Sequence, residues 1–152
     1  MLKNNRLKRE KQQVAEAALA HVPVDGVLGI GTGSTVNYFI EAFSKIKHQV
    51  KHVVASSQAT HQALVAHGIN AVSLNHVSSV DVYIDGADEF NPYLSLIKGG
   101  GGALTQEKII AAASEQFVCI VDSSKQSSRL GKVPVAIEVI SMARSYVARQ
   151  LV

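Results

Sequence analysis

The chain has 152 residues, of which 47% are hydrophobic and 18% are charged, so it has enough apolar side chains to bury a core. This composition excludes a disordered protein, and the single cysteine excludes a disulfide-stapled small protein and fits a reducing compartment. The net charge of +3 has a local origin, because residues 1–11 carry five bases and one acid. Aromatic residues make up only 5% of the chain, and we expect no nucleic-acid partner.

Membrane and export signals are missing from the sequence. No apolar run reaches the ~18 residues of a membrane span. The basic N-terminus is not followed by the apolar core of a signal peptide. We therefore expect a cytoplasmic protein with no membrane partner.

Helical segments alternate with short apolar runs along the chain. In chain order we expect a helix over 5–21, a strand over 27–31, a helix over 35–46, strands over 50–55 and 69–74 with a helix over 59–67 between them, a strand over 80–85, a helix over 104–114 and a strand over 117–122. Several strands are almost continuously apolar, as in a sheet covered on both faces. The pattern predicts an α/β fold, a three-layer α/β/α, Rossmann-like sheet that is mostly parallel.

The C-terminal residues form a separate pattern. A polar, linker-like segment over 123–132 precedes an expected strand over 133–140 and a helix over 141–152, with Ser141 as its N-cap. One strand and one helix cannot cover their own apolar face. We expect residues 1–130 to form a Rossmann-like catalytic domain, and the rest to be the first strand and helix of a small, incomplete second α+β domain.

Glycine and hydroxyl residues follow the first expected strand. The segment GIGTGST at residues 29–35 leads into a helix, and a helix N-terminus with glycines and hydroxyls suits an anion such as phosphate. Ser34 stands where a dinucleotide-binding fingerprint has its third glycine, and the lysine of a P-loop is missing. We favour an anion site at Thr32, Gly33, Ser34 and Thr35 over a turn that needs glycine for packing alone.

Three carboxylates crowd the end of the strand over 80–85. They are Asp85, Asp88 and Glu89 in the segment DGADE. Such a group could move protons on a polyol or hold a hard cation such as Mg²⁺. The alternative is a solvated loop with a capping role, which suits Glu89 better than Asp85, because Asp85 directly ends an apolar strand.

A run of four glycines lies at residues 99–102, directly after Lys98. Four consecutive glycines are entropically costly, which indicates that a ligand approaches the backbone. Thr105 could cap the following helix, whose first turn carries Glu107 where the helix dipole favours an ionised carboxylate. Glu107 is a candidate general base, although it could merely balance the dipole. Lys98 could stabilise an oxyanion or pair with one of the two aspartates above.

Two further lysines are candidates for holding an anion. Lys125 follows an expected strand in the segment DSSK, as the serines at 56–57 follow another. In a parallel sheet these strand ends meet along one edge, where open α/β folds bind ligands. Lys11 falls within an apolar stripe of the first helix, and spacing alone favours a lysine that reaches past its neighbours to solvent.

The remaining reactive side chains predict no further chemistry. His48 and His52 are four apart, but the chain there is expected to be extended, so we interpret them as surface histidines and expect no metal site. Cys119 lies in an apolar strand and is expected to be an inert core thiol. The G-x-S-x-G nucleophile elbow is absent from the sequence.

Taken in order, these motifs resemble the type A ribose-5-phosphate isomerases. The resemblance rests on GTGST at 31–35, DGADE at 85–89, KGGG at 98–101 with ALT and EKII after it, and DSSK at 122–125, and it continues through LGK at 130–132, EVI at 138–140 and MAR at 142–144. It covers nearly the whole chain from about residue 11.

The resemblance implies a reversible, cofactor-free conversion of ribose 5-phosphate to ribulose 5-phosphate through an enediolate, in the non-oxidative pentose phosphate pathway. Glu107 would be the general base that moves a proton between C2 and C1. Asp85 would contact substrate hydroxyls and assist ring opening, while Asp88 and Lys98 would bind the reactive end of the sugar and steady the enediolate charge. The other substrate-binding residues would be Lys11, Thr32, Gly33, Ser34, Thr35, Gly86, Ala87, Gly99, Gly100, Gly101 and Lys125.

The family also sets expectations about assembly and length. Its members are commonly homodimers or larger homo-oligomers, and they continue beyond Val152 to complete the second domain. We expect the site to be encoded within the present chain. The alternatives are a non-catalytic sugar-phosphate sensor and, less favoured, a Mg²⁺-dependent phosphotransfer protein that uses Asp85 and Asp88. An NAD dehydrogenase is disfavoured because the third glycine is missing.

Overall fold

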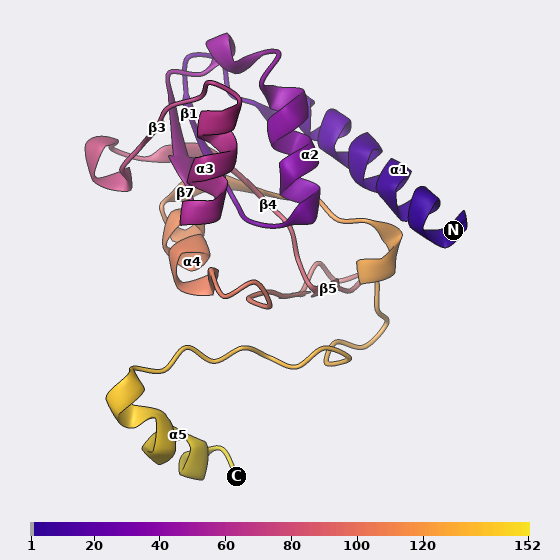
Figure 1. Cartoon of the computed structure of the whole chain (residues 1–152), viewed down its shortest axis with the longest axis vertical. Helices are drawn as coiled ribbons and strands as arrows, with labels where there is room; N and C mark the ends of the chain where they lie inside the picture. Colours follow the sequence, from indigo (N-terminus) through magenta and orange to yellow (C-terminus); the bar gives the residue numbers. More distant parts are fainter. Residues whose placement is uncertain (1) are drawn as a thin grey trace.

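The computed structural model describes residues 2–152 and contains a parallel five-stranded sheet (Figure 1). The strands are β1 (Val27–Ile30), β2 (His52–Ala55), β3 (Ala71–Val72), β4 (Val80–Asp85) and β7 (Ser114–Cys119), and they lie in the order β3-β2-β1-β4-β7. All four pairings between them are parallel. The expected parallel α/β sheet is therefore confirmed, with β1 at its centre between β2 and β4.

Helices cover both faces of this sheet. The first face packs against α1 (Leu2–Ala17), α2 (Ser34–Phe43) and α3 (Gln58–Ala66) around a core that includes the stacked rings of Phe39 and Phe43. The opposite face packs against α4 (Leu104–Ala112), where Ile110 meets Val54, Val80 and Tyr83. The apolar faces of amphipathic helices thus cover apolar strands on both sides, as expected for a three-layer fold.

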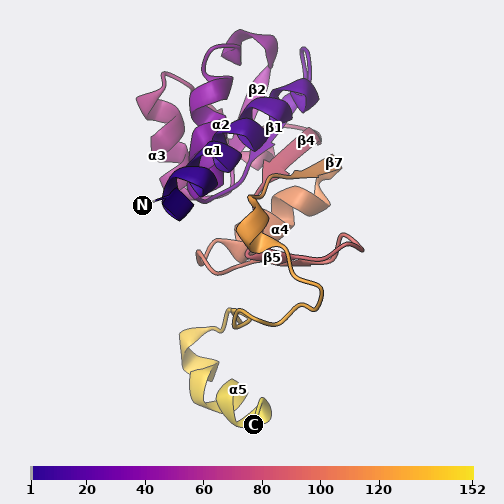
Figure 2. The same cartoon turned by 90° about the vertical axis from the view of Figure 1, so that its right-hand side faces the viewer.

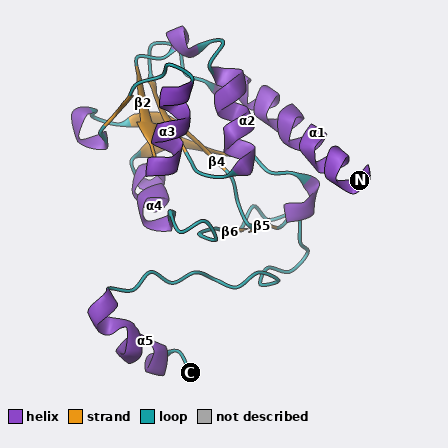
Figure 3. Ribbon diagram, viewed as in Figure 1, coloured by secondary structure: helices purple, strands orange, loops and turns teal. Residues whose placement is uncertain are grey.

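The boundaries of the elements differ from the sequence expectations by a few residues. β4 has the expected bounds, whereas β7 begins at Ser114, because its first residues pair with the start of β4 although they are polar. A short antiparallel hairpin, β5 (Glu89–Phe90) and β6 (Leu96–Ile97), was not expected (Figure 3). It connects the end of β4 to the glycine run, so it positions two of the candidate motifs.

The expected strand over residues 133–140 is wrong. The chain there is extended but pairs with no strand among the described residues, and Val135, Ile137 and Ile140 are exposed. An extended segment without a neighbouring strand has no hydrogen-bond ladder to join. Ser141 does not cap a helix, because it is the first residue of a 3-10 turn that precedes α5 (Arg144–Gln150). This arm, residues 131–152, contacts the rest of the chain at Glu138, which accepts the hydroxyl of Thr105, whereas Figure 2 shows its end with α5 lying apart.

Glu89 joins the arm to the domain. Its carboxylate is buried, with Oε2 accepting the backbone N–H of Gly131 at 2.8 Å and Oε1 accepting that of Val133 at 2.8 Å. The alternative of a solvated loop at Glu89 is therefore wrong. None of the helices in the described part of the chain is long and apolar enough to cross a membrane.

Candidate active site

Most of the candidate residues meet in one cavity at the carboxyl edge of the sheet. The cavity has a volume of about 230 Å³ and lies where β1 and β4 end, next to the glycine run and the start of α4. It is lined by Thr32, Gly33, Ser34, Thr35, Val36, Gly86, Ala87, Asp88, Lys98, Gly99, Gly101, Glu107 and Lys125. Of the catalytic and substrate-binding residues that the resemblance implies, Lys11, Asp85 and Gly100 are not part of this lining.

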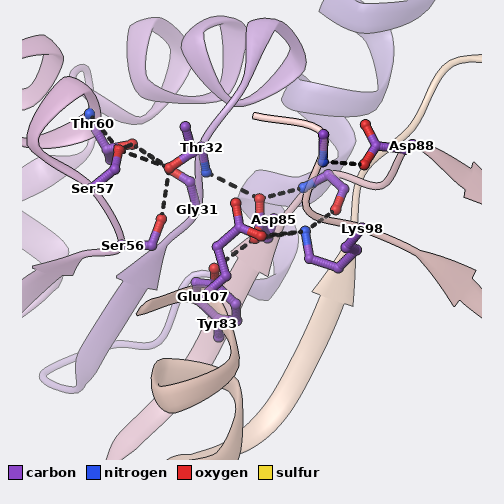
Figure 4. A network of polar contacts seen from close by, with 12 residues as sticks. Gly31, Thr32, Ser56, Ser57, Thr60, Tyr83, Asp85, Asp88, Lys98 and Glu107 are labelled. Carbon is purple, nitrogen blue, oxygen red and sulfur yellow. Dashed lines mark hydrogen bonds and ion pairs between the residues drawn. The ribbon is translucent and has the colours of Figure 1, made fainter. Parts of the chain in front are cut away.

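Asp85 is fully buried behind the cavity, at the end of β4 (Figure 4). Its Oδ1 atom accepts the backbone N–H groups of Gly86 at 2.7 Å and Thr32 at 3.1 Å. Its Oδ2 atom accepts the hydroxyl of Tyr83 at 2.6 Å and lies 2.9 Å from Nζ of Lys98. The carboxylate thereby accepts three hydrogen bonds and pairs with one ammonium group, which together offset the cost of burying a charge.

Gly31 leaves the room that this arrangement needs. A Cβ atom at Gly31 would lie 2.0 Å from Cγ of Asp85, far inside van der Waals contact. The glycine that the sequence placed in an anion-binding turn is therefore required for close packing against a carboxylate. At Gly31 the packing role is thus confirmed, and the anion site over the rest of the turn stays a prediction.

Lys98 connects the two buried carboxylates of the site. Its Nζ atom lies 2.9 Å from Oδ2 of Asp85 and 3.2 Å from Oε2 of Glu107, and it donates to the carbonyl oxygen of Gly86 at 2.6 Å. Burial by itself lowers the pKa of Lys98, but the carboxylate of Asp85, followed by that of Glu107, outweighs burial and raises it. Lys98 therefore carries a positive charge in the site at neutral pH.

Glu107 projects from the first turn of α4 and is 5% exposed. Its Oε2 atom forms no hydrogen bond with any described residue, because the contact with Lys98 is an ion pair without hydrogen-bond geometry. Burial, followed by the charge of Asp85, raises the pKa of Glu107 above its usual value, although Lys98 opposes the shift. The first turn of α4 favours the ionised form of Glu107 through the helix dipole, whereas burial favours its neutral form.

The glycine run wraps around Asp88. The N–H of Gly100 donates to Oδ2 of Asp88 at 2.8 Å, and a Cβ atom at Gly100 would lie 2.9 Å from Oδ1. Gly99 has a φ of +102°, a conformation that side-chain-bearing residues rarely adopt. The close approach that the sequence assigned to a ligand is in part an approach to this aspartate. Asp88 nevertheless lines the cavity, and so does Gly99.

A cluster of hydroxyls surrounds the side chain of Thr32. Its Oγ1 atom lies 2.9 Å from Oγ of Ser56, 2.8 Å from Oγ of Ser57 and 3.1 Å from Oγ1 of Thr60. Thr60 in turn donates to the carbonyl oxygen of Gly31 at 2.6 Å. The cluster ties the turn after β1 to the start of α3. Thr60 was missed in the sequence, although its position three residues after Ser57, the N-cap of α3, could have indicated it.

Two more of the candidate lysines lie in or beside the cavity, whose lining also includes the start of α2. The N-cap of this ten-residue helix is Gly33, and no side chain caps it. Lys125 lines the cavity, and Lys11 of α1 donates to Oγ of Ser34 at 2.9 Å and lies 3.8 Å from Asp122. The interpretation of Lys11 as a lysine that only reaches solvent is wrong, because it contacts the turn at the head of α2.

Metal binding has little support in this site. No group of three or more histidine, cysteine, aspartate or glutamate side chains with metal-binding geometry occurs within residues 2–152. Two of the three carboxylates singled out for Mg²⁺ are engaged elsewhere: Asp85 pairs with Lys98, and Glu89 binds the arm. Cys119 is partly buried, and burial raises the pKa of its thiol to about 11, which keeps it protonated.

Comparisons with known proteins agree with one another. A sequence model of the family described as ribose 5-phosphate isomerase A (phosphoriboisomerase A) matches residues 52–152. A ribose-5-phosphate isomerase A of Legionella pneumophila (strain Corby) is 56% identical over 142 residues, which are 93% of this chain and 66% of the relative. The chain therefore spans slightly less than two thirds of that relative's length.

Two solved structures share the fold. A ribose 5-phosphate isomerase A from Neisseria gonorrhoeae superposes with a TM-score of 0.92 at 51% identity, over 95% of this chain and 65% of the other. A D-ribose-5-phosphate isomerase in complex with phospho-erythronic acid gives a TM-score of 0.90 at 39% identity, over 95% and 66% of the two chains. With two thirds of its residues matched by the family model and its fold shared throughout, the chain belongs to the ribose 5-phosphate isomerase A family.

Proposed function

We propose that the protein interconverts D-ribose 5-phosphate and D-ribulose 5-phosphate through an enediolate, with Glu107 as the general base and no cofactor. The observation that carries the proposal is the carboxylate of Glu107, which is buried at the cavity wall, has an oxygen without a hydrogen bond and lies 3.2 Å from the ammonium group of Lys98. Membership of the isomerase family and the complex of a related isomerase with phospho-erythronic acid support it.

The proton transfer needs only groups that line this cavity. Glu107 takes the proton from C2 of the open-chain aldose, the C–H electron pair forms the C1–C2 double bond, and the carbonyl electrons move to O1. The O2 hydroxyl proton then passes to O1, and Glu107 returns its proton to C1, which leaves the carbonyl group at C2. The reaction is balanced without an oxidant, a reductant or a metal ion.

The charges near Glu107 suit this reaction. Its raised pKa makes the Glu107 carboxylate a stronger base toward the carbon-bound proton. The same shift brings its titration closer to neutral pH. The positive charge of Lys98 stabilises the negative charge that develops on the enediolate oxygens. Asp88, which faces the same cavity, would contact substrate hydroxyls. We assign Asp85 the task of holding Lys98 in place, because its oxygens already accept three hydrogen bonds and pair with the Lys98 ammonium group.

The start of α2 would bind the phosphate group. Its N-terminal N–H groups and the hydroxyls of Ser34 and Thr35 are anion donors, and Lys125 adds a positive charge on the same cavity. Lys11 reaches Ser34 from α1 and would add a second positive charge. Binding energy from the distant phosphate orients the reacting carbons at Glu107.

The location and assembly of the protein belong to the same proposal. A phosphorylated sugar is a charged metabolite of the cytoplasm, so the protein would work there. The family suggests a homodimer or a larger homo-oligomer, which sedimentation or light scattering of the purified chain would measure.

The test is ketose formation from ribose 5-phosphate by the wild-type chain and by Glu107→Gln. The matched control is Glu115→Gln, because Glu115 is exposed on β7 and lies outside the cavity. We expect Glu107→Gln to keep its circular dichroism spectrum and to lose at least about a thousandfold in kcat, and Glu115→Gln to keep full activity. A folded Glu107→Gln variant with normal kcat would refute the assignment of the base.

The second candidate is a sugar-phosphate sensor without turnover. A folded wild-type chain that binds ribose 5-phosphate but forms no ketose would favour the sensor. Activity that disappears with EDTA and returns with Mg²⁺ would instead support metal-dependent chemistry at Asp88.

A further inference from the structure

Tyr83 is a buried polar residue that neither the cavity nor the sequence motifs include. It lies on β4 two residues before Asp85, so both side chains point to the same face of the sheet. The residue is completely buried, its ring packs 5.6 Å from that of Phe117, and its hydroxyl donates to Oδ2 of Asp85 at 2.6 Å (Figure 4). The phenol of Tyr83 is therefore connected to the site through its hydrogen bond to Asp85.

The Tyr83 hydroxyl donates to the same oxygen of Asp85 that pairs with Lys98. Oδ2 of Asp85 is shared by the Tyr83 hydroxyl and the Lys98 ammonium group, while Oδ1 is occupied by two backbone N–H groups. The side chain of Asp85 therefore has a fixed orientation, and its two oxygens have no free direction toward the cavity. Lys98, held by that orientation, is the group that reaches Glu107.

We propose that Tyr83 is a positioning residue of this site: its hydroxyl holds the carboxylate of Asp85, and through Asp85 it keeps Lys98 beside Glu107. The inference rests on the proposed function for its effect on catalysis. Its role differs from that of the residues that line the cavity, because Tyr83 is not part of that lining and donates to Asp85 behind it.

Loss of the hydroxyl has a definite electrostatic direction. Without Tyr83 as a donor, the negative charge of Asp85 is less neutralised, and it draws Lys98 more strongly to itself. Glu107 then faces a stronger repulsion from Asp85 and a weaker attraction to Lys98. Both changes favour the protonated form of Glu107, so the pKa of Glu107 is expected to rise.

The other titratable groups around Glu107 come from several elements. Asp88 follows β4 and Lys98 follows β6. The charges of Lys98 and Asp85 also act on the pKa of Cys119 in β7. The thiol of Cys119 and the phenol of Tyr83 both have raised pKa values, so they stay neutral while a carboxylate titrates. The carboxylates and Lys98 therefore determine the titration of Glu107, and Tyr83 acts on it as a neutral donor.

The test compares Tyr83→Phe with the wild-type chain and with Tyr93→Phe, which removes a phenol hydroxyl at an exposed position. Glutamate side chains are labelled with ¹³C at the carboxyl carbon, and Glu107 is assigned through the signal lost in Glu107→Gln. We expect Tyr83→Phe to raise the titration midpoint of Glu107 by about half a pH unit or more, about threefold in its ionisation constant. Tyr93→Phe should leave the midpoint unchanged.

Kinetics provide the second measurement. We expect Tyr83→Phe to lower kcat about tenfold at neutral pH with KM within about twofold, because the phosphate-binding end of the cavity is unaffected. A folded Tyr83→Phe variant with an unchanged or lowered Glu107 midpoint would overturn the proposal and leave Tyr83 a packing role. If the wild-type chain shows no turnover, the proposed function fails for this chain, while the titration still decides the role of Tyr83.

A second variant tests the proposal if Tyr83→Phe fails to fold. In a chain whose other tyrosines, Tyr38, Tyr93 and Tyr146, are replaced by Phe, Tyr83 is replaced by 3-fluorotyrosine, which keeps the ring and makes the hydroxyl a stronger donor. The proposal then predicts a lowered Glu107 midpoint relative to the same chain with ordinary tyrosine. No change between these two proteins would overturn it.

Discussion

Substitution of Gly31 by alanine tests the central packing of the site. A Cβ atom would stand 2.0 Å from both Cγ and Oδ1 of Asp85, and Asp85 would have to move by more than about 1 Å to restore ordinary contact. This movement pulls Oδ1 away from the N–H groups of Thr32 and Gly86, which lie 3.1 and 2.7 Å from it. The alternative movement, of the β1 backbone, is resisted by the bond from the Gly31 N–H to the carbonyl oxygen of Ile84 at 2.8 Å.

The expected cost follows from these two effects. Overpacking in a core costs about 1–3 kcal/mol, and each hydrogen bond to a buried charge contributes about 1.5–3 kcal/mol. Partial loss of both gives a destabilisation of about 4 kcal/mol, or a Tm lowered by about 10 °C for a chain of this size. Thermal unfolding followed by far-UV circular dichroism measures the shift.

A matched glycine makes the result interpretable. At Gly101 an added Cβ atom would meet no heavy atom within 4 Å, and the backbone φ is not left-handed, so Gly101→Ala should keep or slightly raise the Tm. The reasoning is refuted if Gly31→Ala melts within about 2 °C of the wild type, because Asp85 would then not be held as closely as the distances indicate.

Three further predictions concern the base, the arm and the anion site. Burial, followed by the charge of Asp85, raises the pKa of Glu107, so kcat/KM should fall on acidification with a midpoint above 4.5 as the proposed base becomes protonated. Because the substrate phosphate titrates near pH 6, this midpoint is compared with the carboxyl titration of Glu107 itself. A midpoint at or below 4.5 in both measurements would contradict the assignment. Glu89→Ala removes the two carboxylate acceptors that hold Gly131 and Val133, at about 1.5–3 kcal/mol each, while the contact of Glu138 with Thr105 remains. Trypsin should therefore cut after Lys132 at least about tenfold faster than in the wild type, and equal cutting rates would show that Glu89 does not hold the arm there. Lys125→Ala should raise KM for ribose 5-phosphate about tenfold or more with kcat within about threefold, whereas exposed Lys45→Ala should change neither; a fall in kcat alone would place Lys125 at the reacting carbons instead.

The sheet and the position of the site could be predicted from local sequence patterns. Apolar runs such as residues 80–85 identify strands by themselves, and polar motifs directly after strands must gather at one edge of a parallel sheet. That rule places Thr32, Asp88 and Lys125 at one cavity although they are far apart in the chain. Neither step depends on knowing the depth to which each side chain is buried.

Burial is what the sequence patterns could not supply. The helix dipole at the start of α4 is visible in the sequence and suggests an ionised Glu107, but desolvation, which dominates, depends on what covers the carboxylate. The same limit applies to Glu89, which looks like a loop residue until the arm folds over it. Tyr83 looks like an ordinary strand residue in the sequence, because its polar partner Asp85 is visible only once the strand places both side chains on one face.

The contacts of buried Asp85 explain how Lys98 is held next to Glu107 at the cavity. Asp85 has a negative charge in a fully buried position, and it is tolerated because the ends of β1 and β4 direct two backbone N–H groups at one oxygen while Tyr83 and Lys98 occupy the other. This fixed charge holds a protonated lysine next to a glutamate whose own burial would otherwise favour the neutral acid. A glutamate with a raised pKa that can still ionise, as the proposed base must, requires these opposing effects at once. In this chain the two effects come from different elements around one sheet, so the fold itself sets the balance.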